Sequence, residues 1–353
     1  MGFAWKLITR ELTAILEDEI AIGNECACQL RIAHKGETVV DIAVGNSGTY
    51  GSGEKIDSDS LFPLFSAGKA FLTALTWKLQ EKGVISYDTK ISSLWQEFNT
   101  TDKKDITVEH LLSHRAGMYL LPSGNPDLTD WDGMCRKIAA MPSRHLPGAK
   151  CHYHPLTFAW LLGHTLELAA QTPLPQLLKE EVIYPLGLEN DIFFGIDAVT
   201  AKRLVPVDDL LMPQKPAWEA VLMNDPAVQR CCIPSFGGIG NAKGLVNFYR
   251  QLRGKLVSNE TFDYATSKLF RSPDDPLKVN EWSKFALGLI LPGFPEHPRM
   301  FCGHSGAAGT EAFYMPDYDI AFAFVKNRLN PAHPIHPVRN RISQLLQIPE
   351  RVW

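Results

Sequence analysis

The sequence predicts an α+β fold in which one antiparallel sheet is built from both ends of the chain and a mostly helical region is inserted between them. Three observations lead to this prediction. Residues 26–45 have the composition of a β-hairpin, residues 66 to about 280 carry mainly helical periodicity, and residues 284–327 return to short apolar runs typical of strands. Short links between the later strands imply antiparallel neighbours, so the early hairpin must find its partners at the other end of the chain.

The first elements follow from the pattern of apolar residues. Residues 1–20 mix apolar and charged side chains at helical spacing, which predicts a first helix and not a signal peptide. Two β-rich runs surround a short polar turn at Gly36, and the Gly- and Ser-rich residues 46–60 form a loop. The expected helices that follow the loop start at Ser66 and continue in the runs VEHLLSHRAGM, LTFAWLLGHTLELAA, LPQLLKEEVIYPLGL and AKGLVNFYRQLRG.

The end of the chain completes the predicted sheet. Its strands are expected in KFALGLILPG, RMFCGHSG, EAFYMP and DIAFAFVKN, and RNRISQLLQI is expected to form a closing helix. We therefore predict a sheet-and-helix domain formed by residues 1–65 and 281–353, and a mostly helical domain formed by residues 66–280. Ligand sites usually lie in clefts between such parts, so the active site is expected between the two domains.

Composition limits the function classes. The chain has 353 residues, of which 45% are hydrophobic and 21% are charged, as in ordinary globular proteins. A net charge of −4 without any run of lysines and arginines argues against a nucleic-acid partner, and no stretch approaches the roughly 20 apolar residues of a membrane span. The seven cysteines are odd in number and lack framework spacing, which favours a reducing cytoplasm. We expect a small-molecule substrate, and the sequence leaves the oligomeric state open.

The stretch LFPLFSAGKAFL, residues 61–72, contains the strongest chemical signal. Ser66 opens a nearly all-apolar helical run that stops at Gly83, and Lys69 lies three residues after it. Residues three apart share one face of a helix, so a hydroxyl and an amine would meet in surroundings poor in water. This arrangement is either a helix-capping serine beside a lysine that reaches for solvent, or a nucleophile with its base.

A second Ser-x-x-Lys match shows how weak this spacing is alone. Ser52 and Lys55 lie in YGSGEKIDSDS, where the surrounding glycines and the absence of apolar periodicity predict a loop. In a loop, three-residue spacing does not bring side chains together. We therefore predict no function for this pair.

Two further stretches identify a family. Tyr153 lies in a turn before an apolar helix, and His304-Ser305-Gly306 lies in the glycine-flanked strand FCGHSGAAGTEAFYMP. Together with Ser66 and Lys69, and with VEHLLSHRAGM between them, these motifs resemble the serine β-lactamase-like family along most of the chain. This family includes class C β-lactamases, DD-peptidases, family VIII carboxylesterases and related transesterases, and the resemblance implies a β-lactamase/transpeptidase-like fold.

The resemblance also implies roles for individual residues. Ser66 would attack an acyl carbonyl and form an acyl-enzyme, with Lys69 or Tyr153 as its base and Tyr153 as the later proton donor to the leaving group. The backbone N–H groups of Ser66 and Ala307 would form the oxyanion hole. The same resemblance assigns substrate binding to the third motif and to the position after the tyrosine turn, namely His304, Ser305, Gly306 and Pro155.

Two departures from the family pattern point towards simple esters. Pro155 stands where many β-lactamases have an asparagine, and His304 stands where they have a lysine that suits a substrate carboxylate. We therefore expect a carboxylesterase or acyltransferase on small esters. The alternative within the family is a β-lactamase or a D-amino-acid peptidase or amidase.

Other classes of function have weaker support. GHSGA at residues 303–307 nearly matches the G-x-S-x-G motif, but a strand follows it and only about 50 residues remain, too few for the rest of an α/β-hydrolase site. His110 and His114 have i,i+4 spacing without the glutamate of a zinc motif, so we predict no metal and no cofactor. A non-catalytic structural or binding protein on the same fold is a further alternative, against which Ser66, Lys69 and Tyr153 are all present.

Overall fold

The structure is a computed structural model of the chain. It describes residues 4–48, 51–209, 217–271, 283–292, 301–330 and 337–346. Parts of the predicted segment 281–353 therefore lie outside the described residues, while every predicted site residue lies within them.

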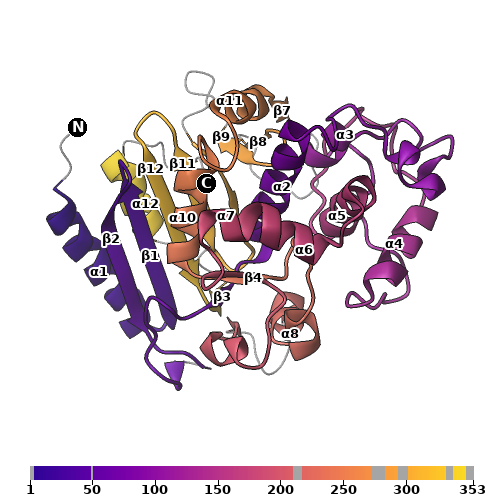
Figure 1. The fold of residues 1–353 in the computed structure, drawn as a ribbon. Coiled ribbons are helices and arrows are strands. Elements are labelled where there is room, and N and C mark those ends of the chain that lie inside the picture. The colour runs from indigo at the N-terminus through magenta and orange to yellow at the C-terminus, as the bar shows by residue number, and fades with distance from the viewer. Residues whose placement is uncertain are drawn as a thin grey trace.

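An eight-stranded sheet joins the two ends of the chain, as the sequence predicts (Figure 1). In spatial order its strands are β2 (Glu37–Gly45), β1 (Ala27–His34), β12 (Ile320–Lys326), β11 (Glu311–Met315), β10 (Cys302–Ser305), β9 (Ile290–Pro292), β8 (Ser283–Phe285) and β7 (Phe270–Arg271). All neighbours are antiparallel, and the N-terminal strand β1 pairs with β12, with Cys28 opposite Lys326. Cys28 and Lys326 are 298 residues apart in the sequence (326 − 28), so the predicted hairpin finds its partner strand near the other end of the chain.

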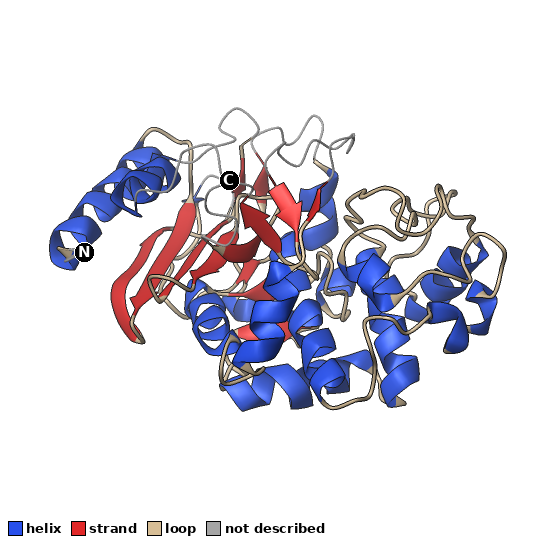
Figure 2. Ribbon diagram, turned by 90° about the horizontal axis from the view of Figure 1, so that it is seen from above, coloured by secondary structure: helices blue, strands red, loops and turns tan. Residues whose placement is uncertain are grey.

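Helices cover both faces of this sheet (Figure 2). On one face, α1 (Trp5–Ala21) and α12 (Pro337–Leu346) pack on Ile320, Phe322 and Phe324 of β12. On the other face, the alternating residues Ala321, Ala323 and Val325 join the core that contains α10 (Ala242–Leu252). Because successive strand residues point to opposite faces, this one strand contributes to two separate cores.

Most of the remaining helices lie beside the sheet, to the right in Figure 1. They are α2 (Lys69–Glu81), α3 (Val108–Leu112), α4 (Trp131–Ala140), α5 (Phe158–Ala170), α6 (Leu174–Leu178), α7 (Tyr184–Leu186), α8 (Trp218–Met223), α9 (Pro226–Gln229) and α11 (Asn259–Ser267). A single π-helical turn, Lys179–Ile183, joins α6 to α7, and short 3₁₀ turns occupy Ile91–Ser93, Gln96–Phe98 and Thr200–Arg203. Helix α2 is mostly buried and ends at Glu81, and the φ of +71° at Gly83 lets the chain turn away after it.

Two small sheets complete the fold. One is formed by β3 (Phe62–Pro63), β6 (Gly238–Gly240) and β4 (Ile192–Phe194), and the other by β13 (Arg328–Leu329) and β5 (Asp208–Asp209). The three-stranded sheet matters for the site, because β3 directly precedes Ser66 and β6 directly follows the loop at Ser235.

The structure corrects one predicted helix. The run VEHLLSHRAGM was expected to be helical throughout, but α3 ends at Leu112, and His114 has a φ of +58°. A non-glycine residue in the left-handed region cannot continue an α-helix, so the chain turns here.

Two elements of the predicted helical domain associate with the sheet. Helix α10 packs on its face, and β7 pairs with β8 at its edge. The division at residues 66 and 280 therefore remains a prediction about domains, and the sheet itself draws on both sides of it.

Two buried ion pairs lie at β12 and β13: one joins the end of β12 to the residues before β1, and the other joins β13 to β5. Lys326 Nζ lies 2.7 Å from a Glu25 carboxylate oxygen, and Arg328 Nη2 lies 2.5 Å from one of Asp208. All four side chains are buried. Breaking either pair by removing one partner would leave a charge uncompensated in the interior, so these pairs fix the relative positions of the strands that carry them.

Candidate active site

Ser66 lies at a sharp turn between a strand and a buried helix. Strand β3 ends at Pro63, the one-turn 3₁₀ helix η2 (Phe65–Gly68) follows, and α2 begins at Lys69. Phe65, directly before the serine, has a φ of +49°, which is a strained conformation for a bulky residue. Such strain persists only where the surroundings enforce it and is common at functional sites.

Ser66 and Lys69 meet as the spacing predicts. The Lys69 Nζ atom lies 3.0 Å from Ser66 Oγ. Ser66 belongs to the 3₁₀ turn, and the N-cap of α2 is Gly68. The serine is therefore not the helix cap proposed as the alternative to a nucleophile.

Two main-chain carbonyls complete the surroundings of the lysine. Lys69 Nζ donates to Pro155 O at 2.7 Å and to Ser235 O at 2.6 Å. The lysine is fully buried, and burial lowers its pKa well below the usual value of a lysine. No carboxylate is among these three hydrogen-bond partners, so none of them supplies a negative charge to balance a protonated amine.

Two glycines allow the segments around Ser66 to approach each other. A Cβ atom at Gly68 would lie 2.8 Å from Pro234 O, beside the carbonyl that Lys69 uses. A Cβ atom at Gly306 would lie only 2.4 Å from Leu64 O. Larger residues at either place would push the 234–235 segment or the end of β10 away from Ser66.

The tyrosine turn lies against the lysine. Tyr153 is in the coil before α5, as predicted, and its ring centroid lies 5.1 Å from Lys69 Nζ. The ring stacks on Phe285 of β8 with 5.8 Å between centroids, and meets the ring of His114 edge-on at 4.8 Å. The phenol is therefore held between elements of the sheet and of the helical region.

The third predicted motif lies at the end of β10. His304 and Ser305 are its last residues, and the N–H of Gly306 bonds to Thr310 O at 2.7 Å to close the following turn. His304 is 5% exposed, and its ring centroid lies 6.1 Å from that of Tyr153. Ser305 and Ala307 are exposed. The motif and the Ser66 turn are thus neighbours through Gly306 and Leu64.

The backbone donors of the expected oxyanion hole are available. Within the described part of the chain, neither the N–H of Ser66 nor that of Ala307 donates a hydrogen bond to another residue. By contrast, one neighbouring N–H group of each does donate: that of Ala67 to Leu64 O and that of Gly306 to Thr310 O.

His304 is electrically neutral. Its Nδ1 lies 2.8 Å from Ser305 O, and because a carbonyl only accepts, Nδ1 carries the proton. Burial, with a smaller contribution from the charge of Lys69, lowers the pKa of His304 to about 3. The expected absence of a fixed positive charge at this position therefore agrees with the local electrostatics.

Sequence reasoning missed several contributors. Ser235 was not predicted, and Pro155 was predicted only for substrate binding. Both contact Lys69 through their carbonyl oxygens, and a main-chain atom leaves no signature in the residue type. His114 and His154 flank the tyrosine turn and are both 1% exposed. For His114, the family resemblance assigns HLLSHRAG a structural role near the site, whereas the spacing to His110 suggests only a weak metal motif.

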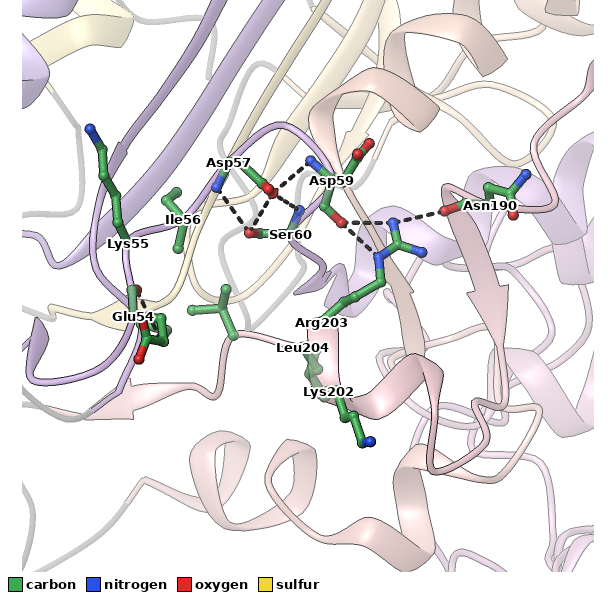
Figure 3. Close-up of a pocket in the computed structure, with 12 residues that line it drawn as sticks. Glu54, Lys55, Ile56, Asp57, Asp59, Ser60, Asn190, Lys202, Arg203 and Leu204 are labelled. Atoms are coloured by element: carbon green, nitrogen blue, oxygen red, sulfur yellow. Dashed lines mark hydrogen bonds between the residues drawn. The ribbon is translucent and has the colours of Figure 1, made fainter.

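The second Ser-x-x-Lys pair lies elsewhere. Lys55 lines an open pocket of about 560 Å³ with Asp57, Asp59 and Arg203, and its side chain points away from these residues (Figure 3). Ser66, Lys69, Tyr153 and His304 do not line this pocket. Its arginine already donates to the main-chain oxygens of Asp59 and Asn190, so the pocket is a feature of loop packing.

Structural comparison defines the fold class. A family VIII carboxylesterase matches with a TM-score of 0.83 at 24% identity, covering 96% of this chain and 97% of the other. A penicillin-binding protein homologue from Caulobacter crescentus matches with a TM-score of 0.79 at 26% identity, over 99% and 98% of the two chains. The fold is therefore β-lactamase/transpeptidase-like, as the motifs predicted.

The family follows from the sequence itself. The Beta-lactamase family model matches residues 27–345, and the chain belongs to this family. Among curated relatives, the Esterase/beta-lactamase LipL of Mycobacterium tuberculosis (strain ATCC 25618 / H37Rv) is 25% identical over 335 residues, covering 83% of this chain and 75% of the relative. Among the described residues, no helix is both long and apolar enough to cross a membrane.

The buried histidines predict how stability depends on pH. Burial lowers the pKa of His114, and it lowers the pKa of His154 and His304 to about 3. The unfolded chain protonates histidine below about pH 6.5. Below this pH, unfolding takes up protons. These histidines therefore make the free energy of unfolding rise with pH up to about pH 6.5, and above that pH they contribute no further pH dependence.

We expect the substitution His304→Asn to remove one of the histidines that take up a proton on unfolding. The slope of the free energy of unfolding against pH, between about pH 4.5 and 6, should fall by about 1.4 kcal/mol per pH unit. Urea unfolding at several pH values measures this slope. An unchanged slope would show that His304 is already protonated in the folded protein.

Proposed function

We propose that the protein is a serine hydrolase that forms an acyl-enzyme on Ser66, and that it acts as a carboxylesterase, or acyltransferase, on small esters. One observation carries the proposal: the fully buried Lys69 amine lies 3.0 Å from Ser66 Oγ and has two main-chain carbonyls as its other partners. Family membership supports a hydrolase, and the curated relative named an esterase/β-lactamase supports the ester class.

The partners of Lys69 determine where its lone pair points. A neutral amine has two N–H bonds and one lone pair, and the carbonyls of Pro155 and Ser235 can only accept. Its two N–H bonds satisfy these carbonyls, which leaves the lone pair for the Ser66 hydroxyl. Burial lowers the pKa of Lys69 and so favours this neutral form, which the proposed mechanism requires.

Acylation then follows from this geometry. Ser66 Oγ attacks the acyl carbonyl as its proton passes to Lys69 Nζ, and the N–H groups of Ser66 and Ala307 stabilise the developing oxyanion. The bond to the leaving alcohol breaks, and that alcohol receives the proton through the Tyr153 phenol. Lys69 returns to its neutral form when the proton has been passed on.

Deacylation uses the same groups in reverse. Water or a second alcohol gives its proton to the Tyr153–Lys69 pair and attacks the acyl carbon, and Ser66 leaves with a proton returned from Lys69. Water as acceptor gives hydrolysis, whereas an alcohol gives acyl transfer. We place this reaction in the predicted cleft between the sheet and the helical region.

Two residues favour neutral esters over β-lactams. Pro155 has no side-chain amide, and its carbonyl is already used by Lys69. His304 is buried and neutral, so it offers no fixed charge to the carboxylate of a penicillin or cephalosporin. A β-lactamase or D-amino-acid amidase remains the second candidate, supported by the match to a penicillin-binding protein homologue.

The proposed setting is the cytoplasm, with a small-molecule substrate and no cofactor. All seven cysteines are free thiols, which suits a reducing compartment. A purely structural or binding role is disfavoured because such a protein has no need of a buried, desolvated amine beside a serine, an arrangement that costs stability.

The first test of this proposal is removal of the nucleophile. Ser66→Ala should abolish both ester turnover and covalent labelling by a fluorophosphonate, because Ser66 is the hydroxyl that is hydrogen-bonded to the buried amine of Lys69. Lys69→Ala and Tyr153→Phe should each lower kcat by a factor on the order of 10² to 10⁴. Intact-mass spectrometry and p-nitrophenyl butyrate hydrolysis measure the two effects.

Ser52→Ala is the matched control, since Ser52 has the same sequence spacing to a lysine but lies in the loop. It should behave as the wild type in both measurements. A phosphonate adduct that persists in Ser66→Ala would disprove the assignment of the nucleophile.

The second test compares substrates. With a neutral His304 and no side-chain amide at Pro155, kcat/KM should be higher for p-nitrophenyl butyrate than for the cephalosporin nitrocefin or for a D-amino-acid amide. Penicillins should acylate slowly and leave slowly, and so act as weak inhibitors. The opposite order of kcat/KM, lost in Ser66→Ala, would favour the β-lactamase or amidase alternative while leaving the nucleophile in place.

A further inference from the structure

His114 contacts the tyrosine turn on both sides of Tyr153. The N–H of His152 donates to His114 O at 2.9 Å, and the N–H of His154 donates to His114 Nδ1 at 3.2 Å. The His114 ring also meets the Tyr153 ring edge-on, with 4.8 Å between centroids. One residue therefore holds the residues before and after the tyrosine, as well as the tyrosine ring.

The segment that contains Tyr153 also contacts the segment after α3 through other residues. His154 Nε2 accepts a hydrogen bond from the N–H of Met118 at 3.2 Å, and Thr157 Oγ1 donates to Met118 O at 2.7 Å. The rings of His114 and His154 stack with 5.4 Å between centroids. The segment after α3 and the segment before α5 are thus joined at several points, all close to Tyr153.

The hydrogen bonds require both histidines to be neutral. His114 Nδ1 and His154 Nε2 each accept from a main-chain N–H, so neither atom can carry a proton. Lys69, His154 and His304 all disfavour a charge on His114, and burial disfavours it most. The ring of His114 is therefore a fixed acceptor and not a proton carrier.

The backbone of His114 is strained in a way that serves this contact. Its φ of +58° places the residue in the left-handed region, which ends α3 and turns the residue towards the tyrosine segment. Glycine and asparagine adopt this conformation most easily. A histidine is kept here at a conformational cost, which is consistent with a function for its ring.

We propose that His114 is a positioning residue for catalysis: its carbonyl and its Nδ1 atom fix the turn that carries the Tyr153 phenol. This inference rests on the proposed role of Tyr153 in proton transfer. A shift of about 1 Å in a catalytic group can lower a rate by about 10²-fold, so the placement of this turn matters for kcat.

Two substitutions separate the acceptor from the backbone conformation. Both His114→Asn and His114→Gly suit a positive φ, but only asparagine has an acceptor, Oδ1, the same number of bonds from Cα as Nδ1. For p-nitrophenyl butyrate, His114→Gly should lower kcat by about 10- to 100-fold with little change in KM, and His114→Asn should recover most of the loss. Equal kcat in the two variants would overturn the proposal.

A double-mutant cycle tests whether the effect passes through the tyrosine. In the Tyr153→Phe background, His114→Gly should cost no further rate, because the group that it positions is already gone. If the two substitutions lower kcat by factors that multiply in the double variant, His114 has a general structural role, and the proposal is contradicted. If His114→Gly does not fold, His114→Gln takes its place, because its acceptor is one bond further from Cα.

Hydrogen exchange provides a readout that does not depend on activity. The amide of His154 should exchange faster in His114→Gly than in His114→Asn, while amides in the buried helix α2 stay protected in both. Unchanged protection at His154 would overturn the inference. If the wild type neither turns over esters nor reacts with the fluorophosphonate, the proposed function fails, and the exchange result alone then decides whether His114 holds this turn.

Discussion

The site depends on one buried amine. Lys69 lies at the start of a helix that is apolar on nearly every side, and its three hydrogen-bond partners come from three separate segments, at Ser66, Pro155 and Ser235. An ammonium ion without a carboxylate is costly in such a place, whereas a neutral amine satisfies two carbonyls and keeps a lone pair for the serine. The same burial that would destabilise a cation is what, in the proposed mechanism, makes Lys69 a base.

The buried histidines around this amine also favour their neutral forms. His114, His154 and His304 are buried, and each has a lowered pKa. Neutral histidines can hold neighbouring segments by directed hydrogen bonds without adding a charge near Lys69. The site is therefore organised by main-chain carbonyls and imidazole acceptors. The buried ion pairs Lys326–Glu25 and Arg328–Asp208 lie at β12 and β13 and include none of these site residues.

Local features of the site and the fold could be predicted from the sequence, and features that depend on tertiary contacts could not. Ser66 and Lys69 are three residues apart, so one turn of chain brings them together, and two β-rich runs around the turn at Gly36 predicted the hairpin of β1 and β2. The carbonyl of Ser235 reaches Lys69 only because Gly68 and β6 bring its segment close, and no residue pattern encodes such a contact.

Two helices, α3 and α10, also differ from the sequence prediction because of tertiary contacts. The predicted helix VEHLLSHRAGM extends past Leu112, where α3 ends; His114 has a positive φ there and contacts the tyrosine turn. Helix α10 was expected with the inserted region, yet its apolar face packs on the small residues Ala321 and Ala323 of the sheet. In both cases tertiary packing decided the outcome where periodicity alone was ambiguous.

The charge state of Lys69 is the central claim, and NMR can measure it directly. In protein labelled with ¹³C at the lysine Cε, the Lys69 signal can be assigned by its loss in Lys69→Arg and followed from about pH 6 to 11. We expect it to keep the shift of a neutral amine near pH 7 and to show no step near the usual lysine pKa of about 10.4. A Lys69 signal that titrates near 10.4, together with the exposed lysines, would contradict the account.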